Sequence, residues 1–296
     1  MTRSGWVRAT LMPAASVLAV GCSSLALGLL NLPARFGDYR LVPDLSYGDG
    51  TRLALDVYVP RGGAAPRPVV VFFHGGRWSG GRKETYRFAA DALTGRGYVA
   101  VVPTHRLYPE VRFPVFVQDG AEAVAWTRRH IAAYGGDPAR IFLMGHSSGA
   151  HIAALLVLDA DYLRAAGGSP DWIAGMIGLA GPYDFLPLGA PDLKDMFGPA
   201  ERYPASQPIT FARAEAPPLL LLHGKADETV YPRNSINLAR AVRERGGDAE
   251  VKLYAGVGHS AILAALSRPL RGRAPVVDDV DRFIRDRVAA EGVTAP

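Results

Sequence analysis

The sequence contains a single cysteine, Cys22, in 296 residues. One thiol excludes an intramolecular disulfide framework and any metal site built from several cysteines. An excess of charge of one sign is also missing, since 33 Lys and Arg oppose 28 Asp and Glu for a formal net charge of +5, and the basic residues form no stripe. We therefore expect no nucleic-acid partner. With 49% hydrophobic residues, the chain can bury a sizeable core as one globular domain.

Charge is absent from residues 9–32, which follow Arg3 and Arg8. This pattern is typical of a targeting segment, so residues 1–32 are expected to be a signal or anchor and residues 33–296 the folded domain. The stretch that ends at Cys22 resembles a bacterial lipoprotein box, in which Cys22 would carry the lipid. An uncleaved membrane-spanning helix and an ordinary cleaved signal peptide are the alternatives. All three predict an extracytoplasmic domain, and the first two predict membrane attachment.

Beyond residue 40, short β-rich runs alternate with longer helical patterns, which predicts an α/β fold with a mostly parallel sheet. Continuous apolar runs are expected where a strand is covered on both faces, whereas an alternating run is expected nearer the sheet edge. Residues 53–59 alternate, and residues 117–132 have the apolar spacing of a helix. The further strands are expected at residues 69–73, 98–102, 141–144, 173–180, 219–222 and 251–254.

Residues 182–218 interrupt this alternation because they hold eight of the 23 prolines of the chain. Proline disfavours a continuous helix or strand. An insertion at the carboxyl ends of parallel strands is a typical place for a cap over a substrate pocket. We therefore expect a small proline-rich cap, with a plain surface loop as the alternative.

The pentapeptide at 145–149 reads Gly-His-Ser-Ser-Gly and fits the pattern G-x-S-x-G. A strand-like run precedes it and a helix-like run follows it, which is the setting of a nucleophile elbow. Side chains at 145 and 149 would clash where strand and helix approach closely, and Ser147 would stand at a helix N-terminus. Ser147 is thus the candidate nucleophile, although an ordinary strand-to-helix turn would produce the same pattern.

A serine hydroxyl needs a base to take its proton and an acid to orient that base. His259 follows the last expected strand on a loop and is the candidate base. Asp227 follows the strand at 219–222, at the same sheet end as Ser147, and is the candidate acid. Glu228 and Asp184 are the alternative acids. The chain order Ser, Asp, His is that of α/β-hydrolases.

Backbone N–H groups that bind the oxyanion of a tetrahedral intermediate are expected at His74-Gly75-Gly76-Arg77-Trp78, directly after the strand at 69–73. Glycine there lets N–H groups approach a substrate oxygen. The predicted oxyanion hole combines the N–H of Ser148 with that of Gly75 or Gly76. A plain glycine turn is the alternative. This chemistry requires no metal and no organic cofactor.

Together, the segments at 74–78, 145–151, 227 and 258–259 resemble an α/β-hydrolase over residues 44 to 290. Within that superfamily the chain resembles the carboxylesterase branch related to hormone-sensitive lipase and to arylformamidase-like esterases. The resemblance implies an eight-stranded, mostly parallel sheet with helices on both faces, the triad Ser147, Asp227 and His259, and substrate contacts at His74 and Trp78. Arg77 replaces the third glycine of the His-Gly-Gly-Gly lipases, which is a departure from that pattern.

The expected function is hydrolysis of small carboxylic esters, with short acyl groups, through an acyl-enzyme on Ser147. Three alternatives remain at this point. The enzyme would instead be an arylformamidase-like amide hydrolase, or an esterase that removes acetyl or feruloyl groups from polysaccharide, or the chain would be a catalytically silent surface binding module. The sequence leaves the oligomeric state open.

Overall fold

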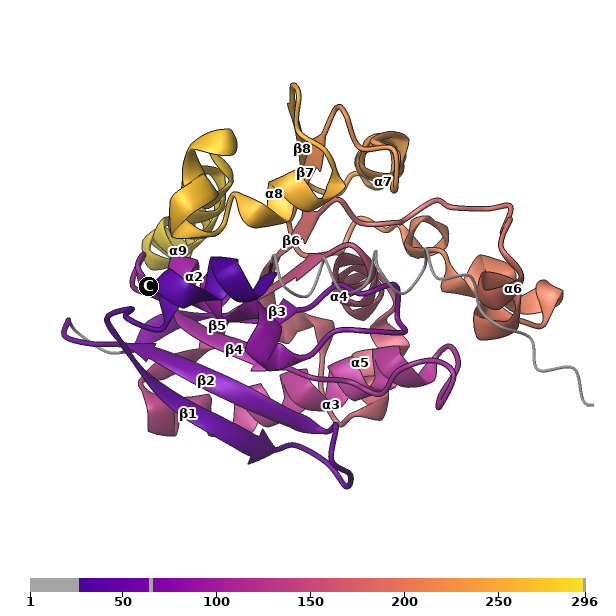
Figure 1. Cartoon of the computed structure of the whole chain (residues 1–296). Helices are drawn as coiled ribbons and strands as arrows, with labels where there is room; N and C mark the ends of the chain where they lie inside the picture. The colour runs from indigo at the N-terminus through magenta and orange to yellow at the C-terminus, as the bar shows by residue number, and fades with distance from the viewer. Residues whose placement is uncertain (1–26, 64–65, 295–296) are drawn as a thin grey trace, which may run out of the picture.

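The computed structural model describes residues 27–63 and 66–294, which form an eight-stranded sheet between two layers of helices (Figure 1). The sheet order is β1-β2-β4-β3-β5-β6-β7-β8. β1 pairs antiparallel with β2 and β2 with β4, and all other neighbours are parallel. The strands are β1 (Tyr39–Ser46), β2 (Ala54–Pro60), β3 (Arg67–Phe73), β4 (Val99–Pro103), β5 (Gly136–His146), β6 (Ile173–Leu179), β7 (Leu219–Gly224) and β8 (Ala249–Tyr254).

The expected mostly parallel sheet and its seven expected strands are therefore confirmed, and the alternating β2 lies second from one edge. The edge strand β1 was not expected from the sequence. It contains Pro43, and Asp44 has a φ of +57° where the register with β2 shifts. A bulged edge strand of this kind interrupts the period-two pattern by which strands are recognised.

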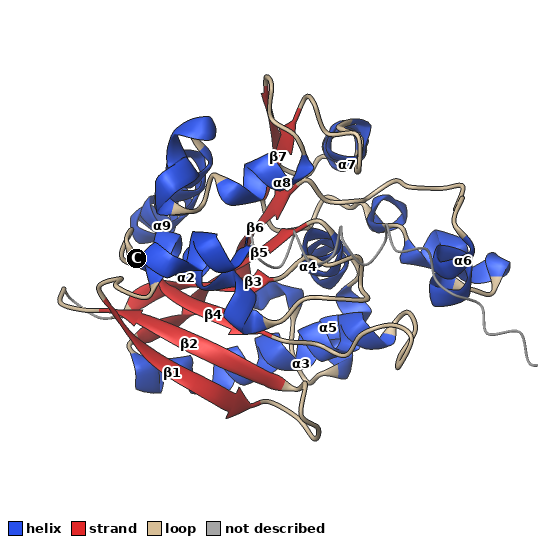
Figure 2. Cartoon of the chain, in the orientation of Figure 1, coloured by secondary structure: helices blue, strands red, loops and turns tan. Residues whose placement is uncertain are grey.

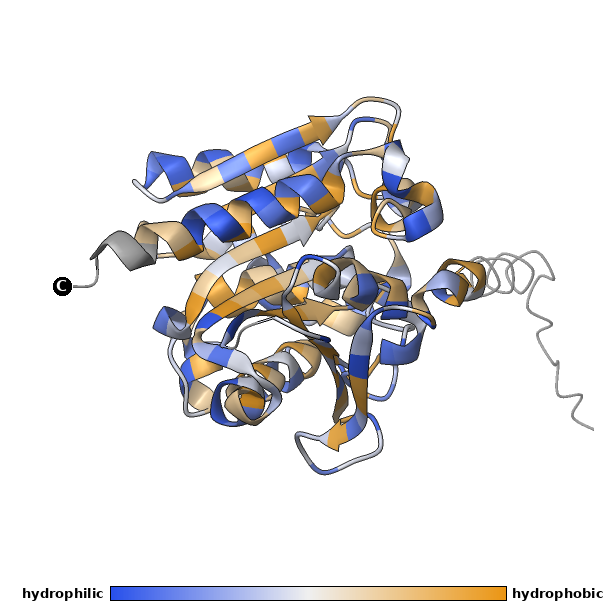
Figure 3. Ribbon diagram, turned by 90° about the vertical axis from the view of Figure 1, so that its left-hand side faces the viewer, coloured by the Kyte–Doolittle hydropathy of each residue, from blue (hydrophilic) through white to orange (hydrophobic). Residues whose placement is uncertain are grey.

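Helices cover both faces of the sheet, as Figure 2 shows. Alternate side chains of β3 enter opposite cores: Val69 and Val71 pack beneath α3 and α4, whereas Val70 and Phe72 pack beneath α2 and α9. In Figure 3 the strands are largely hydrophobic, while the helices carry many hydrophilic residues. The helices are α2 (Arg87–Thr94), α3 (Val115–His130), α4 (Ser148–Leu158), α5 (Ala160–Ala165), α6 (Pro191–Phe197), α7 (Arg233–Glu244), α8 (His259–Ala264) and α9 (Val276–Thr294).

Short 3-10 helices link several of these elements, at Lys83–Tyr86, Ile131–Tyr134, Pro170–Trp172, Ala200–Ser206, Pro208–Phe211 and Arg268–Arg273. Two of them, together with α6, make up the proline-rich excursion at 182–218, which has no long helix and no strand, as expected. The excursion packs on the domain through aromatic rings. The centroid of Trp78 lies 4.9 Å from that of Phe197 and 6.0 Å from that of Phe185.

Residues 27–34 are helical, and the expected domain boundary after residue 32 falls within this helix. Asn31 and Ala34 are buried against the domain. The anchor interpretation treated this stretch as separate from the fold because an apolar run looks the same in either role. Cys22 lies outside the described residues. Within the part of the chain that the structure describes, no helix combines the length and the apolar character needed to cross a membrane.

Candidate active site

Ser147 occupies a strained turn between β5 and α4, with φ of 55° and ψ of −123°. The turn depends on its two glycines. A Cβ at 149 would lie 2.1 Å from the carbonyl oxygen of Phe73, and a Cβ at 145 would lie 2.4 Å from the backbone of Gly149. These are the clashes that the sequence pattern predicts, and they hold the serine at the carboxyl end of the sheet, above the N-terminus of α4.

Three side chains from separate segments form a continuous hydrogen-bonded relay. The Ser147 hydroxyl donates to Nε2 of His259 over 2.9 Å, and Nδ1–H of His259 donates to Oδ2 of Asp227 over 2.8 Å. An ionised carboxylate only accepts hydrogen bonds, so the proton belongs on Nδ1 and the lone pair of Nε2 faces the serine. The relay thus holds His259 in the tautomer that can take a proton from Ser147.

The two alternative acids lie elsewhere. Asp184 accepts a hydrogen bond from Nδ2 of Asn237 over 2.7 Å, and Glu228 is exposed. Asp227 reaches His259 because it directly follows β7, whose neighbour β8 leads into α8. The structure therefore brings together the three residues that the sequence order suggested.

The Asp227 carboxylate is fully buried and receives several hydrogen bonds. Its Oδ1 accepts the backbone N–H groups of Thr229 and Val230, each over 2.9 Å. Nε2 of His223 lies 3.3 Å from Oδ2 and also donates to the carbonyl of Val230. Burial alone would raise the pKa of Asp227, but the hydrogen bonds from His223, His259 and Val230 outweigh it and hold that pKa well below its usual range. The carboxylate is ionised at neutral pH.

His146 has a role that the sequence did not reveal. Its Nε2–H donates to the backbone carbonyl of His259 over 3.1 Å, and the centroids of the two rings, which are tilted by 43°, lie 4.8 Å apart. Burial, and then the neighbouring His259, lower the pKa of His146 to about 3, so the ring is neutral. The only signal in the sequence was its position next to Ser147.

The loop at 74–78 depends on its glycines and runs close to the nucleophile. Gly76 has a φ of +133°, and a Cβ there would lie 2.2 Å from the carbonyl oxygen of Gly80. A Cβ at Gly75 would lie 3.3 Å from the Cβ of Ser147, so this loop runs directly beside the nucleophile. Ser148 is the first residue of α4, and its N–H has no acceptor within the helix. The oxyanion hole of Gly75, Gly76 and Ser148 stays a prediction.

Trp78 lines the same cavity as Ser147, and its contact with substrate stays a prediction. Its indole N–H donates to Nδ1 of His151 over 3.2 Å, and Nε2–H of His151 donates to the carbonyl of Ser206 over 2.7 Å. Burial lowers the pKa of His151 to about 4, so this ring is also neutral. These two hydrogen bonds link the loop at 74–78 to the proline-rich excursion at 182–218.

The predicted substrate contact of His74 is wrong. This side chain is fully buried, does not line the cavity, and stacks on His105 at 4.4 Å and on Tyr86 at 5.6 Å. His74 directly follows β3 and points into the domain beneath the loop, whereas the residues that come after it turn toward the cavity. Its position supports the loop from below.

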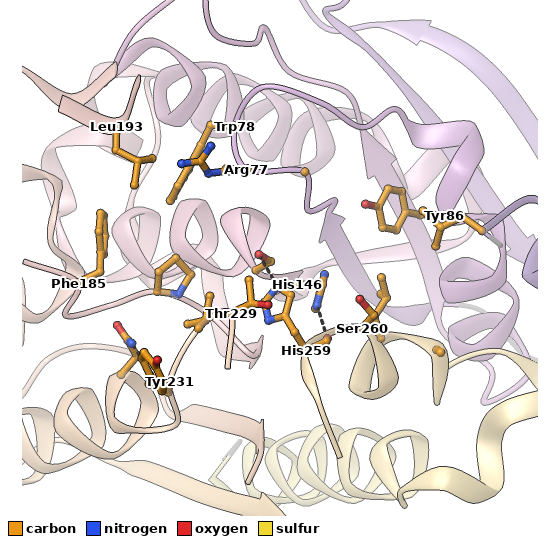
Figure 4. A pocket seen from close by; sticks show the side chains of 18 of the residues that line it. Arg77, Trp78, Tyr86, His146, Phe185, Leu193, Thr229, Tyr231, His259 and Ser260 are labelled. Atoms are coloured by element: carbon orange, nitrogen blue, oxygen red, sulfur yellow. Dashed lines mark hydrogen bonds between the residues drawn. The ribbon is translucent and has the colours of Figure 1, made fainter. Parts of the chain in front are cut away.

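The cavity around Ser147 has a volume of about 1060 Å³ and extends to both sides of the Ser147–His259 pair (Figure 4). On one side, which we call the cap arm, the walls are Trp78, Phe185, Leu193 and Tyr231. Pro187, two residues after Phe185, also lines the cavity and is counted with this arm. On the other side lies Tyr86 (Figure 4). Leu27, Leu30 and Leu263 line the cavity and pack in the same apolar cluster as Tyr86. We call this side the N-terminal arm and include in it the neighbouring lining residues Ala264 and Leu270. Sequence reasoning had identified only Trp78 among these wall residues.

Among residues 27–63 and 66–294, the structure shows no group of three His, Cys, Asp or Glu side chains that would hold a metal ion. That catalysis needs no metal or cofactor stays a prediction.

A serine held in a strained strand-to-helix turn, with a histidine and a buried aspartate in series behind it, defines a hydrolase of the α/β-hydrolase fold. The sequence agrees with this class. Residues 55–242 match the BD-FAE family, and the chain belongs to that family of α/β-hydrolase carboxylesterases.

Three similar proteins carry esterase names. The probable isoprenylcysteine alpha-carbonyl methylesterase ICMEL1 of Arabidopsis thaliana is 32% identical over 76% of this chain and 52% of its own. Esterase LipQ of Mycobacterium tuberculosis is 31% identical over 87% of this chain and 66% of its own. The thermophilic esterase Est2 of Thermogutta terrifontis, solved with propionate bound, is 25% identical with a TM-score of 0.69 over 88% of this chain and 96% of that one. The present chain thus spans about half the length of the plant relative and two thirds of LipQ.

Proposed function

We propose that this protein is a serine carboxylesterase that hydrolyses esters of short carboxylic acids. The observation that carries the proposal is the relay Ser147–His259–Asp227, with hydrogen bonds of 2.9 and 2.8 Å and a buried, ionised acid at its end. A silent binding module would have no need to keep three such groups aligned at a cavity. The relay therefore favours catalysis over the non-enzymatic alternative.

In the first step the Ser147 oxygen attacks the ester carbonyl while Nε2 of His259 takes the hydroxyl proton. The carbonyl oxygen becomes an oxyanion, which backbone N–H groups of the loop at 74–78 and of Ser148 stabilise. The tetrahedral intermediate then collapses. The bond to the alcohol oxygen breaks, the His259 proton passes to that oxygen, and the alcohol leaves an acyl-enzyme behind.

In the second step water replaces the alcohol. The water oxygen attacks the acyl carbon while Nε2 of His259 takes one proton of the water. The bond between the acyl carbon and the Ser147 oxygen then breaks. The same proton returns to the serine oxygen, and the carboxylic acid is released. Asp227 stays ionised throughout and stabilises the imidazolium form of His259.

Two observations support a preference for short acyl groups: a solved relative and the side chains that wall the cap arm. Est2, at 25% identity, is a neighbour solved with propionate, a three-carbon acid. The cap arm is walled by rigid aromatic and proline side chains, including Trp78, Phe185 and Pro187, and not by a long apolar lid. An arylformamide or an acetylated or feruloylated polysaccharide would meet the same catalytic relay, so these alternatives are separated by assay.

The test is hydrolysis by the full chain of p-nitrophenyl acetate, butyrate and decanoate, with an aryl formamide and an acetylated xylan beside them. We expect activity on the acetate and butyrate and none above background with Ser147→Ala. Activity confined to the formamide would replace ester by amide hydrolysis. Activity on no substrate, or activity that survives Ser147→Ala, would overturn the proposal.

We further infer that the domain lies outside the cytoplasm and is held at a membrane by the segment 1–32. The basic start, the uncharged run 9–32 and the box at Cys22 support this inference. Expressed in a bacterium, the protein should sediment with membranes and incorporate labelled fatty acid, and Cys22→Ala should abolish the label. Membrane sedimentation without any label would favour the uncleaved anchor, and a protein found only in the soluble extracytoplasmic fraction would favour a cleaved signal peptide.

A further inference from the structure

The proposed mechanism leaves one part of the cavity without a role, the N-terminal arm. The walls of this arm come from four separate segments: the helix at 27–34, the 3-10 helix Lys83–Tyr86, the helix α8 and the 3-10 helix Arg268–Arg273. α8 begins at the base His259, and Leu263 and Ala264 of the arm lie one turn further along the same helix. The arm therefore opens directly beside the reacting groups, opposite the cap arm (Figure 4).

Apart from Ser260, which follows His259 in α8, the walls of the N-terminal arm are hydrocarbon (Figure 4). Leucine side chains at 27, 30, 263 and 270 supply most of them. The Tyr86 hydroxyl donates to the backbone carbonyl of Gly75 over 3.1 Å, so its donor is already paired within the protein and the ring lines the cavity. The two cations among the described lining residues, Arg77 and Arg233, belong to the cap side, where Arg77 pairs with Asp192 and Arg233 lies over the Tyr231 ring. Apart from the Ser260 hydroxyl, the described lining of the arm offers a polar group no hydrogen-bond partner to replace water.

The helix at 27–34 is fastened to the domain by a buried side chain. Nδ2 of Asn31 donates to the carbonyls of Glu84 and Thr85 over 3.1 and 2.7 Å, and its Oδ1 accepts the N–H of Phe88 over 2.9 Å. Both the nitrogen and the oxygen of the Asn31 amide thus bond to the backbone of one segment, residues 84–88. This holds Leu27 and Leu30, one helical turn apart, toward the cavity. Leu29, between them in sequence, is 63% exposed and does not line the cavity.

We propose that the N-terminal arm binds a hydrocarbon group of the ester substrate, and that Leu30 of the 27–34 helix determines how long this group can be. The proposal rests on the proposed esterase function and names the substrate class: an ester with a hydrocarbon group well beyond one or two carbons on one side. A cavity of about 1060 Å³ is larger than an ethyl or methyl ester can fill. His259 delivers its proton to the alcohol oxygen next to this arm, so the alcohol group is the expected occupant.

Two ester series distinguish the possible sources of the hydrocarbon group. One lengthens the alcohol, from ethyl to decyl acetate, and the other lengthens the acid, from p-nitrophenyl acetate to decanoate. Each methylene that enters the arm should raise kcat/KM about fourfold until the arm is full. We expect the rise in the alcohol series. A rise in the acid series instead would assign the arm to the acyl chain and would overturn only the short-acyl preference.

Leu30→Trp fills the arm, and Leu270→Trp does so from a different segment in case the first variant fails to fold. Both should lower the ratio of decyl to ethyl acetate kcat/KM by tenfold or more. Leu29→Trp is the matched control, because it adds the same bulk to the exposed side of the same helix, and it should keep the wild-type ratio. A length profile that is flat in both series, or that is unchanged in both arm variants, would overturn the proposal.

Failure of the esterase function is recognised separately. Binding of decyl acetate to the Ser147→Ala protein, measured by titration calorimetry in bile-salt micelles, does not require turnover. Tighter binding of decyl than of ethyl acetate, lost on adding Leu30→Trp, would support the arm even if no ester were hydrolysed. Equal binding of the two acetates would overturn it.

Discussion

The backbone carbonyl of His259 accepts a hydrogen bond from Nε2–H of His146, 3.1 Å away, so the residue next to the nucleophile holds the base that activates it. The nucleophile and the base lie on segments far apart in the sequence, and this bond joins them independently of the Ser147 hydroxyl. Catalysis depends on such positioning because a small displacement of the reacting groups lowers the rate steeply.

Replacing His146 by Phe should therefore slow the reaction. The variant keeps an aromatic ring of similar size but removes the donor to His259, so we expect kcat for p-nitrophenyl acetate to fall about 10- to 100-fold, with a smaller change in KM. His130→Phe, on the exposed end of α3, is the control and should leave both constants unchanged. An unaltered kcat in His146→Phe would show that the relay keeps its geometry without this bond.

The choice of Asp227 over the alternative acid Asp184 can be tested by a matched pair of substitutions. Asp227→Asn would reverse the tautomer of His259 and should lower kcat by about 10³- to 10⁴-fold, as in other Ser-His-Asp enzymes. Asp184→Asn removes a carboxylate that contacts only Asn237 among the described hydrogen bonds and should stay within about twofold of wild type. Steady-state rates with p-nitrophenyl acetate measure both variants. A larger loss of kcat in Asp184→Asn than in Asp227→Asn would show that Asp184, and not Asp227, is the acid.

The elbow should tolerate no side chain at position 149. A Cβ there meets the Phe73 carbonyl oxygen at 2.1 Å, so Gly149→Ala should destabilise the fold by about 1–3 kcal/mol or more and also displace Ser147. Gly272→Ala is the control, since a Cβ at 272 meets no atom within 4 Å. Urea denaturation measures both variants, and equal midpoints for the two would contradict the close approach of β3 and α4.

The free energy of unfolding should decrease as the pH falls below 6.5, the ordinary pKa of a histidine side chain. Burial lowers the pKa of His74 and His151 from 6.5 to about 4 each, so both rings are neutral in the folded protein. Below pH 6.5 both rings bind protons in the unfolded chain but stay neutral in the folded protein until the pH approaches 4. The contribution of these two histidines to stability is thus fully present above pH 6.5 and is lost as the pH falls toward 4.

Thermal unfolding between pH 7.5 and 4 measures this slope. His151→Gln keeps an acceptor for Trp78 and a donor for Ser206 but does not titrate, so its Tm should change less with pH in this range than that of the wild type. A parallel pH profile for the two proteins would show that burial of His151 does not contribute.

Much of the fold could be predicted because it depends on local patterns. The continuous apolar runs at 69–73 and 219–222 became β3 and β7, since a strand covered on both faces must be apolar throughout. The glycines around Ser147 indicated the elbow because few other residues permit that approach of two backbones. The bulged strand β1 was missed because Pro43 and Asp44 break the alternation there.

Candidate triad residues were recognisable by residue type and by their position after expected strands, but their pairing was not. Asp227 and Asp184 both follow strands, and only the course of β8 into α8 brings His259 to Asp227. His74 was misassigned for a related reason. Its neighbours Gly75 and Gly76 mark the loop, yet which side of that loop a side chain faces depends on backbone torsions that the residue names do not specify.

The sequence by itself determined the alternation of strands and helices, the strained serine turn and the set of groups available for acyl transfer, because these follow from local sterics and residue chemistry. Tertiary structure alone decided that His146 holds His259 and that Leu27 and Leu30 form a wall of the cavity. An apolar run has the same composition in a lipid anchor and in a packed helix. The hydrogen bonds of Asn31, which join residues more than fifty positions apart, show that residues 27–34 pack on the domain.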